Sequence, residues 1–576
     1  MGITHEHHSR YIIGIDLGTT TSSLSFVDTA KDRSVHQFMI PQLVGPGEIS
    51  AEPMLPSACY VPAGHEFPEG ALDLPWRASP ACIVGRFARM HGAKVPGRLV
   101  TSAKSWLAHP GVDRTAGILP WGGELADKAL SPVAVSRQYI EHLRDAWNER
   151  FGGMRDSDGA ICSLEEQRVI VTVPASFDEA ARELTVQAAR EAGLRHLILL
   201  EEPLAVFYDW LRCHEETWQN VLREGHTVLV VDIGGGTTDF SLIRIEPGMT
   251  LRRTAAGEHL LLGGDNIDMA LARQVEQAWQ AQLDPRDWTQ LVQQCREAKE
   301  ALLSDPAKAD HPVALSGRGS SVVAGARGHR IARGTLDTLL TDGFFPRIPA
   351  TDHGPRRRAA LREMGLPYAA DAAVTRHLLS FLRAAAEPGT PAPGIARPDF
   401  ILFNGGALIP SMLRARLCAV VGAWLGTGEP VPELESRNFS LAVSTGASYY
   451  GLVRRGEGVR VRGGMARAYY LEVARADGAD LLCVMPRDTE EGVPVEITGH
   501  DLALAANTPV RFPLLCSATR LGDAPGDIVP DDESVTRMPS LTTIITFGKG
   551  GQKRDLSVRL GAMLNEVGTL DIWCAT

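Results

Sequence analysis

The sequence predicts an α/β protein with two similar halves, followed by a smaller β-rich region. Two strand–turn–strand segments with the same pattern, starting near residues 11 and 228, indicate the two halves. Between residues 168 and 211, strands alternate with helices, which is typical of an α/β architecture. After residue 451 the pattern changes to short strands and turns without a long helix, which predicts an all-β region.

The segment 228–243, with the sequence VLVVDIGGGTTDFSLI, predicts a phosphate-binding hairpin. Its β-branched and leucine-rich start predicts a buried strand, and Gly234, Gly235 and Gly236 supply a turn without side chains, which a phosphate can approach closely. Apolar residues resume after Asp239, so the chain leaves the turn as a second strand. A Rossmann or P-loop site needs a helix at that point, and the pattern therefore argues against both.

The same design occurs near the amino terminus, where an apolar strand over 11–15 ends at Asp16. Gly18, Thr19 and Thr20 form the turn, and the apolar pattern resumes at residue 24. The separation of Asp16 and Asp232 is too long for a solenoid repeat, but it suits a duplicated domain that clamps a ligand between its halves. We expect the cleft between the halves to hold phosphate groups.

The remaining elements follow from hydrophobic periodicity and turn residues. The region 41–100 predicts long loops with short strands and a helix start at 55–61 and 81–88. We expect strands over 168–174 and 196–200 and from residue 400, and helices over 133–150, 178–192 (closed by Gly193), 204–211, 288–303 and 372–382, with further helices after Gly264 and Pro410. In the β-rich region we expect strands over 469–473, 481–485, 493–497, 510–515, 541–547, 555–560 and 568–573.

Charge and composition are typical of a soluble globular protein. The 576 residues suffice for several domains, and 44% of them are hydrophobic. The formal net charge of −11 gives no electrostatic footprint for nucleic acid, and no window approaches the roughly 18 apolar residues of a membrane span. The amino terminus lacks the apolar core of a signal peptide, and nine single cysteines fit reduced thiols, so we expect a cytoplasmic protein without nucleic-acid or membrane partners.

Three polar features allow more than one interpretation. His5, His7 and His8 either bind a metal or belong to a frayed terminal tail. Glu202, at the end of a strand, either faces the cleft as a site residue or is an exposed loop residue. The arginine run at 356–358 is either a solvated loop or a site for an anion or partner.

Seven motifs along the chain occur in the order that is typical of one protein family. They are GIDLGTT at 14–20, VTVPASF at 171–177, EEPLA at 201–205, VVDIGGGTTDFS at 230–241, LGGDNID at 262–268, CREAKEAL at 295–302 and FNGGALIP at 403–410. With them the chain resembles the seventy-kilodalton heat-shock chaperones of the DnaK type, whose ATPase domain has a two-lobed, actin-like fold with duplicated ribonuclease-H-like halves. The tail resembles that family's peptide-binding sandwich only in VMPRDTEEGVP and VGTLDI.

The resemblance implies a domain organisation. An actin-like ATPase domain would cover 10–455, a linker 456–466, and a β-rich domain for peptide binding 467–576. The family's helical lid is absent from this sequence.

The resemblance also implies a site for ATP or ADP with Mg²⁺. Asp16 and Asp232 would hold the hydrated ion, and Lys104 would stand beside the γ-phosphate. Glu202 and Asp239 would position the attacking water, and Thr237 would complete the catalytic group. The residues around the phosphates and the adenosine would be Gly18, Thr19, Thr20, Gly234, Gly235, Gly236, Thr237, Gly263, Gly264, Lys299, Gly405 and Gly406.

Elementary electrostatics favours the same assignment. A carboxylate about 4 Å from a phosphate is repelled by roughly 4 kcal/mol at an effective dielectric constant of 20, so Asp16 and Asp232 require a divalent cation between them and the phosphates. Mg²⁺ suits this position because it keeps several waters and binds through few carboxylates. Lys104 would then stabilise the negative charge that develops in the transition state.

The chain departs from the family at the adenosine end and in the linker. Arg296 and Glu300 stand where the family has a glutamate and an arginine, and the arginine that would stack on the base is missing after Gly406. These changes weaken nucleotide binding or loosen the choice of base. A segment rich in glycine and arginine replaces the acidic, leucine-rich linker, which bears on the coupling between ATP state and peptide release.

The sequence therefore predicts a divergent heat-shock-type chaperone. It would use slow ATP hydrolysis as a conformational switch coupled to unfolded or extended polypeptide clients, together with co-chaperones. Two alternatives stay open: a nucleotide-binding scaffold or filament protein without turnover, and a small-molecule kinase of the same superfamily. In the kinase, Asp239 or Glu202 would deprotonate an acceptor hydroxyl.

Overall fold

The computed structural model describes most of the chain. It covers residues 9–575 except 110, 124, 126–127, 259, 316–326, 356–361, 364–365, 388, 392, 459–460, 463–466, 476–477, 488, 490–492, 499, 501, 506, 508, 518–519, 521, 533, 539, 545–554 and 566–568. His5, His7, His8 and the arginine run 356–358 lie outside the described residues, as do the ends of the strands predicted at 541–547 and 568–573.

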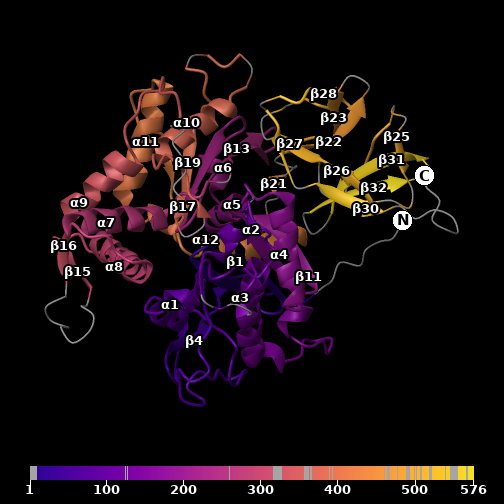
Figure 1. Cartoon of the computed structure of the whole chain (residues 1–576). Helices are drawn as coiled ribbons and strands as arrows, with labels where there is room; N and C mark the ends of the chain where they lie inside the picture. Colours follow the sequence, from indigo (N-terminus) through magenta and orange to yellow (C-terminus); the bar gives the residue numbers. More distant parts are fainter. Residues whose placement is uncertain are drawn as a thin grey trace.

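Two six-stranded sheets form the centre of the protein (Figure 1). The first has the order β11-β10-β1-β2-β3, with β6 paired to β2, and the second has the order β20-β19-β12-β13-β14-β21. The strands of the first are β1 (Tyr11–Leu17), β2 (Thr21–Asp28), β3 (Val35–Gln37), β6 (Leu55–Pro56), β10 (Arg168–Val173) and β11 (His196–Glu201). Those of the second are β12 (Thr227–Ile233), β13 (Thr238–Glu246), β14 (Thr250–Ala256), β19 (Phe400–Asn404), β20 (Glu433–Leu434) and β21 (Val461–Arg462).

The central hairpin of each sheet has the same arrangement of neighbouring strands. β1 pairs antiparallel with β2 and parallel with β10, and β12 pairs antiparallel with β13 and parallel with β19. Asp16 pairs with Ser23 in one hairpin, and Asp232 pairs with Asp239 in the other. The repeated sequence pattern thus corresponds to repeated strand pairing, and it brings both aspartates to the same end of their sheets.

Helices α5 (Glu202–Cys213) and α12 (Ala442–Arg454) join the two sheets through one hydrophobic core. This core takes side chains from both sheets, including Ile12 and Val230, and from both helices. Gly446 of α12 lies so close to the carbonyl group of Ala205 that an added Cβ would overlap with it. The close helix contact therefore requires glycine at this position.

Smaller elements surround the first sheet. The strands are β4 (Ile40–Gly45), β5 (Glu48–Glu52), β7 (Ala58–Tyr60), β8 (Ile83–Val84) and β9 (Leu99–Thr101). The helices are α1 (Arg86–Gly92), α2 (Ala103–Leu107), α3 (Pro132–Trp147) and α4 (Glu179–Glu191), while α6 (Trp218–Val221) places Trp218 in the core shared by the two sheets. The side chain of Asp178 caps α4 by accepting a hydrogen bond from Ala181 N at 2.7 Å.

A second group of elements surrounds the second sheet. The helices are α7 (Gly264–Ala278), α8 (Pro285–Ser304), α9 (Arg333–Thr338), α10 (Val374–Ala384) and α11 (Ser411–Leu425). The strands are β15 (Asp310–Leu315), β16 (Arg327–Ala332), β17 (Arg362–Glu363) and β18 (Leu366–Pro367). In Figure 1, α7, α8 and α9 extend away from the central sheets above α1.

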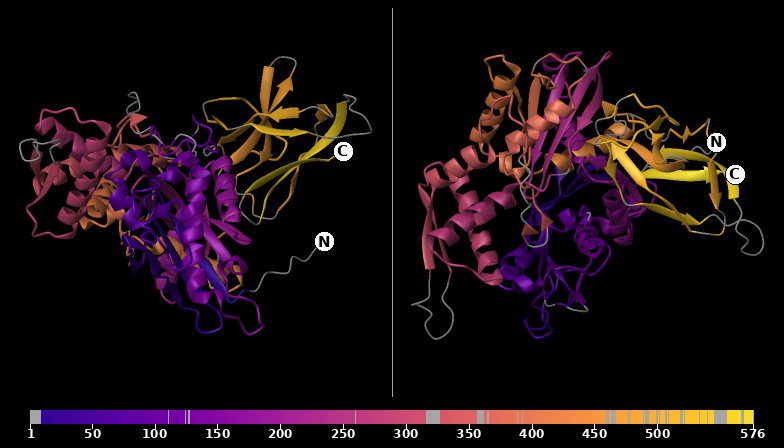
Figure 2. Two further views of the ribbon diagram at one scale, coloured as in Figure 1. Left: turned by 60° about the horizontal axis from the view of Figure 1, so that its bottom comes forward. Right: turned by 45° about the horizontal axis from the view of Figure 1, so that its top comes forward.

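The carboxyl-terminal part contains strands and lies to one side of the central sheets (Figure 2). A five-stranded sheet has the order β28-β23-β22-β27-β29, β24, β31, β25 and β32 form a second sheet, and β26 pairs with β30. One core takes Leu482 from the first of these sheets and Leu560 from the second. The strands are β22 (Ala468–Arg475), β23 (Gly478–Met485), β24 (Val495–Glu496), β25 (Leu502–Ala505), β26 (Pro509–Phe512), β27 (Leu514–Ser517), β28 (Ile528–Val529), β29 (Thr536–Arg537), β30 (Leu541–Ile544), β31 (Asp555–Leu564) and β32 (Leu570–Ala575).

The β-rich part contacts the first residue of α4 and the segment before this helix. Tyr469 Oη donates a hydrogen bond to Glu179 Oε1 at 2.8 Å, and the backbone N of Leu570 donates to Glu179 Oε2 at 3.1 Å. Arg467 donates to the carbonyl oxygen of Ser176 at 2.9 Å. Glu179 is buried under these contacts, and burial raises the pKa of its carboxyl group.

Three segments differ from the sequence prediction. Residues predicted as long loops form the hairpin β4–β5, and β15 and β16 form a second hairpin in a segment for which the sequence predicted no strands. Within the predicted linker, β21 pairs in parallel with β14 of the second sheet. These strands are short or mostly polar, so their hydrophobic pattern is too weak to predict them. Their conformation is determined by pairing with other strands in the folded protein.

Gly446→Ala is expected to destabilise the core shared by the two sheets. The added methyl group would overlap with the Ala205 carbonyl group and force α5 and α12 apart. Overpacking of this kind costs about 1–3 kcal/mol. Chemical unfolding followed by circular dichroism measures the loss.

The matched control is Gly334→Ala in α9. A Cβ at Gly334 meets no atom within 4 Å, so this change should leave stability unchanged or raise it slightly, because alanine favours helix. Equal effects of the two substitutions would contradict the tight contact at Gly446.

Candidate functional site

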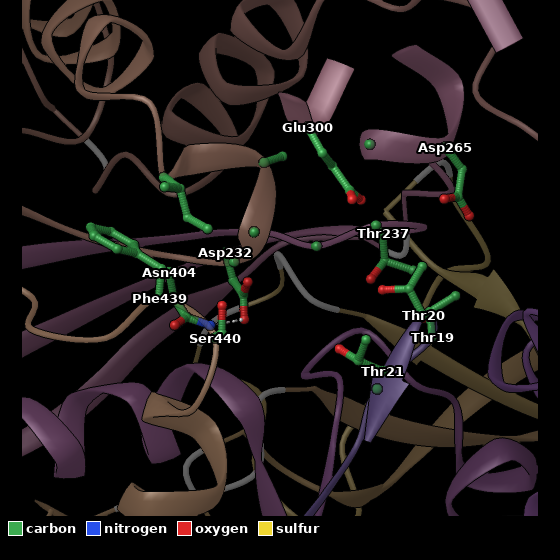
Figure 3. Close-up of a pocket in the computed structure, with 18 of the residues that line it drawn as sticks. Thr19, Thr20, Thr21, Asp232, Thr237, Asp265, Glu300, Asn404, Phe439 and Ser440 are labelled. Carbon is green, nitrogen blue, oxygen red and sulfur yellow. Dashed lines mark hydrogen bonds between the residues drawn. The ribbon is translucent and has the colours of Figure 1, made fainter. Parts of the chain in front are cut away.

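A cavity of about 480 Å³ lies between the turns of the two central hairpins. Figure 3 shows Thr19, Thr20 and Thr21 on one side of this cavity near Thr237, and Asp232 on the other side beside Asn404. The predicted site residues that line it are Asp16, Gly18, Thr19, Thr20, Lys104, Glu202, Asp232, Gly234, Gly235, Thr237, Gly264, Lys299, Gly405 and Gly406. The other three predicted residues, Gly236, Gly263 and Asp239, lie against these lining residues.

The two glycine–threonine turns approach each other closely. A Cβ added to Gly236 would lie 2.5 Å from Cγ2 of Thr19, and a Cβ added to Gly235 would overlap with Thr20. Side chains on these glycines would therefore displace the threonines. Turns of this kind present backbone N–H groups and hydroxyl groups, which are suitable donors for phosphate oxygens.

Three buried carboxyl groups (Glu202, Asp232 and Asp239), the half-buried carboxyl group of Asp16 and the buried Lys104 form the charged centre of the site. Lys104 on α2 forms an ion pair with Glu202 at the start of α5. Burial and the charge of Glu202 raise the pKa of Asp16 to about 7 and that of Asp232 to about 8. The same two causes raise the pKa of Asp239 to about 7. Lys104 alone does not neutralise this group of acids.

Lys104 keeps its proton in this environment. Burial lowers the pKa of its ammonium group, but the charges of Glu202 and Asp16 oppose burial, and the net result is a raised pKa. Lys104 is therefore a fixed positive charge beside the two turns.

Three polar residues that the sequence analysis missed support the aspartates. Asn404 donates a hydrogen bond to Asp232 Oδ2 at 3.0 Å, and Thr172 donates to Asp16 Oδ1 at 3.3 Å. Both lie at the carboxyl ends of the parallel strands that flank the hairpins, β19 and β10. Ser176 donates to Asp239 Oδ1 at 2.6 Å. The sequence could have indicated Thr172 and Asn404 as site residues, because they lie at the ends of apolar strands, where ligands bind in α/β sheets.

The residues present fit a hydrated divalent cation. Within the described residues, no group of three or more His, Cys, Asp or Glu side chains is arranged to hold a metal directly. Mg²⁺ does not need such a cage, because it binds through one or two carboxylates and keeps its remaining ligands as waters or phosphate oxygens. The uncompensated buried carboxyl groups of Asp16 and Asp232 are suitable for this mode.

The far end of the cavity lies between α8 and the turn after β19. Arg296 contacts Asp265 at 2.5 Å and Asp268 at 3.0 Å. Lys299 contacts Asp268 at 2.6 Å and donates to the carbonyl oxygen of Gly264 at 3.0 Å. Both cations of this wall are therefore already paired within the protein.

Glycine is required at two other positions of the site. Gly405 has a φ of +91°, and an added Cβ would overlap with the carbonyl group of Ile233. A Cβ on Gly263 would lie 2.7 Å from the carbonyl oxygen of Gly234. These close approaches hold the turn after β19 and the start of α7 against the second hairpin.

Two matching sheets, two glycine–threonine turns and a buried acidic centre with one lysine are the chemistry that a phosphorylated ligand with a divalent cation requires. Comparison with known proteins is consistent with this class of site. Residues 120–342 match the family model described as "Hsp70 protein".

Several curated relatives are named "Chaperone protein HscA homolog". The protein of Acidithiobacillus ferrooxidans (strain ATCC 53993 / BNL-5-31) is 31% identical over 378 residues, which cover 62% of this chain and 50% of the relative. Those of Shewanella sp. (strain MR-7) and Azotobacter vinelandii (strain DJ / ATCC BAA-1303) are 30% identical over 310 residues and 33% identical over 312 residues. Each of these two alignments covers 51% of this chain and 42% of the relative.

The predicted resemblance to Hsp70-type proteins is therefore confirmed. The mixed α/β architecture with several sheets is consistent with the ATPase-type fold of that family. The chain spans about half the length of the curated relatives that it matches. Among the helices that the structure describes, none is long and apolar enough to cross a membrane.

Asp232→Asn is expected to stabilise the metal-free protein progressively as the pH rises. The folded pKa of Asp232, about 8, lies above the usual value of about 4 for the unfolded chain. Its contribution to stability is therefore complete at low pH and is lost as the pH rises through 8, whereas asparagine has no such loss. The difference should grow by on the order of 2 kcal/mol between about pH 6 and about pH 8. Chemical unfolding in EDTA measures it.

The control for this prediction is Asp158→Asn. Asp158 is exposed, so its substitution should have the same effect on stability at both pH values. If Asp232→Asn behaves like Asp158→Asn, ionisation of a buried Asp232 does not limit stability.

Proposed function

We propose that the chain is a divergent molecular chaperone of the Hsp70 type that binds and slowly hydrolyses ATP with Mg²⁺. The observation that carries the proposal is the buried acidic centre around Lys104, which faces two glycine–threonine turns from two sheets of matching order. A two-lobed, actin-like ATPase domain over 10–455 accounts for that arrangement. The cytoplasm is the compartment that we propose for it.

The roles of the residues follow from their chemistry. The turns containing Thr19, Thr20 and Gly234 would bind the phosphate oxygens, and Asp16 and Asp232 would hold a hydrated Mg²⁺ through its waters. Bound there, Mg²⁺ would offset the phosphate charge. A water would attack the γ-phosphorus as the bond to the ADP oxygen breaks, giving ADP and inorganic phosphate.

Two carboxyl groups are candidates for orienting this water. Asp239 has a pKa near 7, and a group with a pKa near the working pH is effective in proton transfer. Glu202 is held by Lys104 and lines the cavity. Lys104 itself would stabilise the transition state by its charge, so catalysis would rest on positioning and electrostatics.

Contacts between the β-rich part and the ATPase site support a coupled switch. Arg467 donates to the carbonyl oxygen of Ser176, and the hydroxyl of Ser176 donates to Asp239. Two hydrogen bonds through a single residue thus connect the β-rich part with a carboxyl group of the site. Pairing of β21 with β14 adds part of the predicted linker to the second sheet.

The β-rich region 467–576, after a linker over 456–466, would bind unfolded or extended polypeptide. A core shared by its two sheets supports a sandwich. Binding of peptide to this region would disturb the contacts of the region with Glu179 and Ser176. Co-chaperones would act on the same cycle of ATP hydrolysis and peptide binding.

A nucleotide-binding scaffold without turnover is the second candidate. It is favoured by the far end of the cavity, where Arg296 and Lys299 are paired within the protein and the residues directly after Gly406 are Ala407 and Leu408 in place of the family's arginine. Nucleotide binding without phosphate release, together with sedimenting polymers, would support it. Phosphate transfer to a sugar in an acceptor screen would instead favour a small-molecule kinase.

Lys104→Ala is expected to abolish hydrolysis while leaving nucleotide binding nearly unchanged. The ammonium group would act on the charge of the transition state, whereas the turns would bind the ground-state phosphates. Single-turnover release of γ-phosphate from magnesium ATP measures the first effect, and titration with ADP measures the second.

Lys31→Ala, which removes an exposed lysine, is the control and should retain the full rate. Lys104→Met keeps the apolar stem and tests whether loss of packing contributes. Equal turnover of Lys104→Ala and the unmodified protein would reject the site assignment.

Arg467→Ala is expected to slow γ-phosphate release by roughly tenfold at most. Loss of its bond to Ser176 would leave Asp239 less well positioned, and small displacements in active sites slow catalysis. The exposed Arg511 provides the control substitution Arg511→Ala. If Ser176→Ala slows release but Arg467→Ala does not, Ser176 positions Asp239 without coupling to the β-rich part.

A further inference from the structure

Two cysteines lie on the same face of the three-stranded sheet β8-β7-β9. Cys59 of β7 pairs with Val84 of β8, and Cys82 precedes Val84 by two residues. Because side chains alternate along a chain in this conformation, Cys82 and Cys59 share a face, and such diagonal neighbours are within reach of each other. Cys59, Val84 and Cys82 accordingly belong to one hydrophobic core, whereas Tyr60 and Ile83, which alternate with them, belong to another.

The two thiol groups interact directly. Cys59 donates a hydrogen bond to the sulfur of Cys82. In its thiol form Cys82 donates in turn to Gln138 Oε1 of α3 at 3.2 Å. Both cysteines are free thiols. Their sulfurs are therefore neighbours without a covalent bond between them.

The surroundings of Cys82 favour its thiolate. The hydrogen bond from Cys59 lowers the pKa of Cys82, and the charges of Arg77 and Arg137 lower it further, against burial and the charge of Glu141. Among the nine cysteines, all of which lie within the described residues, Cys82 alone has a lowered pKa. A thiolate near arginine is the nucleophilic form of cysteine.

Access from solvent differs between the two sulfurs. Cys82 is half-buried, whereas the side chain of Cys59 has no exposed surface. A small oxidant can therefore reach Cys82 from solvent, while Cys59 is shielded and has Cys82 as its neighbour. This is the arrangement of an attacking thiol with a second thiol behind it.

A buried hydroxyl group lies in the same core. Tyr139 packs with Cys59, and its Oη has no hydrogen-bond partner within the described residues. Burial and the charges of Cys59 and Cys82 raise the pKa of Tyr139, so its hydroxyl keeps its proton. It is thus a donor near both sulfurs.

We propose that Cys82 and Cys59 form a peroxide-reactive dithiol, in which Cys82 is oxidised first and Cys59 then closes a reversible disulfide. The Cys82 thiolate attacks one oxygen of hydrogen peroxide, the O–O bond breaks, and the leaving hydroxide becomes water with the proton that Cys82 released. The sulfur of Cys59 then attacks the sulfenic acid of Cys82, the S–O bond breaks, and the oxygen leaves as a second water with the proton of Cys59. The two sulfurs together lose two electrons, which reduce the peroxide.

The bridge would join β7 to β8 in the sheet that precedes Lys104 in the chain. β7 also pairs with β9, and α2, which carries Lys104, begins two residues after β9. The proposal stands independently of the proposed ATPase function, because it requires only the two thiols and the peroxide.

Oxidation of the reduced full chain with a small excess of hydrogen peroxide, followed by peptide mapping with mass spectrometry, tests the proposal. We expect a peptide pair linked through Cys59 and Cys82, a protein mass lower by two hydrogen atoms, and recovery of both thiols with dithiothreitol. In the unmodified protein, iodoacetamide should alkylate Cys82 at least about tenfold faster than the half-buried Cys574, because alkylation requires the thiolate.

Three substitutions separate the roles of the two thiols. Cys59→Ser should leave Cys82 as a sulfenic acid that dimedone labels, because the second thiol is missing. Cys82→Ser should leave Cys59 unoxidised, because peroxide does not reach it. Cys574→Ser is the control: burial raises the pKa of Cys574, and its loss should leave the Cys59–Cys82 linkage intact.

Two outcomes in the unmodified protein would overturn the proposal. Equal rates of alkylation at Cys82 and Cys574 would show that Cys82 is not an activated thiol. Oxidation of Cys82 to sulfinic acid without a linked peptide would exclude Cys59 as its partner. Neither outcome would bear on the proposed ATPase.

Discussion

Burial of carboxyl groups at the ends of two hairpins is the constraint on which the rest of the structure depends. Asp16, Asp232 and Asp239 lie in an environment that raises the pKa of each to about 7 or 8, and Lys104 supplies one positive charge against them. Burying ionised groups without partners costs more than most folds tolerate, so such a cluster persists where a ligand or ion compensates it. The hydrogen bonds from Thr172, Asn404 and Ser176 fix the acids in place without removing the excess charge.

The repeated strand pairing explains how distant residues form one site. Each sheet places an aspartate at the end of a hairpin strand and a polar donor at the end of the adjacent parallel strand. Helices α5 and α12 hold the sheets together through a common core, and the contact at Gly446 leaves little space between them. A movement of one sheet against the other would therefore require α5 and α12 to move, and it would change the shape of the cavity.

The two ends of the cavity differ in the groups that line them. At the phosphate end, backbone turns and fixed charges suit any nucleotide. At the other end, Arg296 and Lys299 are paired internally with Asp265 and Asp268. The β-rich part contacts Ser176, which in turn donates a hydrogen bond to Asp239, and it also contacts Glu179.

The sequence by itself determined the two hairpins, the main helices and most of the residues that meet at the cavity, because glycine turns, apolar strands and isolated carboxylates are local signals. It predicted α4 over 178–192 and β10 over 168–174, and the structure has them at Glu179–Glu191 and Arg168–Val173. The hairpin β4–β5, the pairing of β21 with β14 and the hydrogen bonds of Thr172 and Asn404 to the two aspartates were decided only by tertiary structure. Tertiary structure also decides that Arg296 pairs with Asp265 and Asp268. These ion pairs depend on how α7 packs against α8, and no local sequence pattern encodes the distance between the two helices.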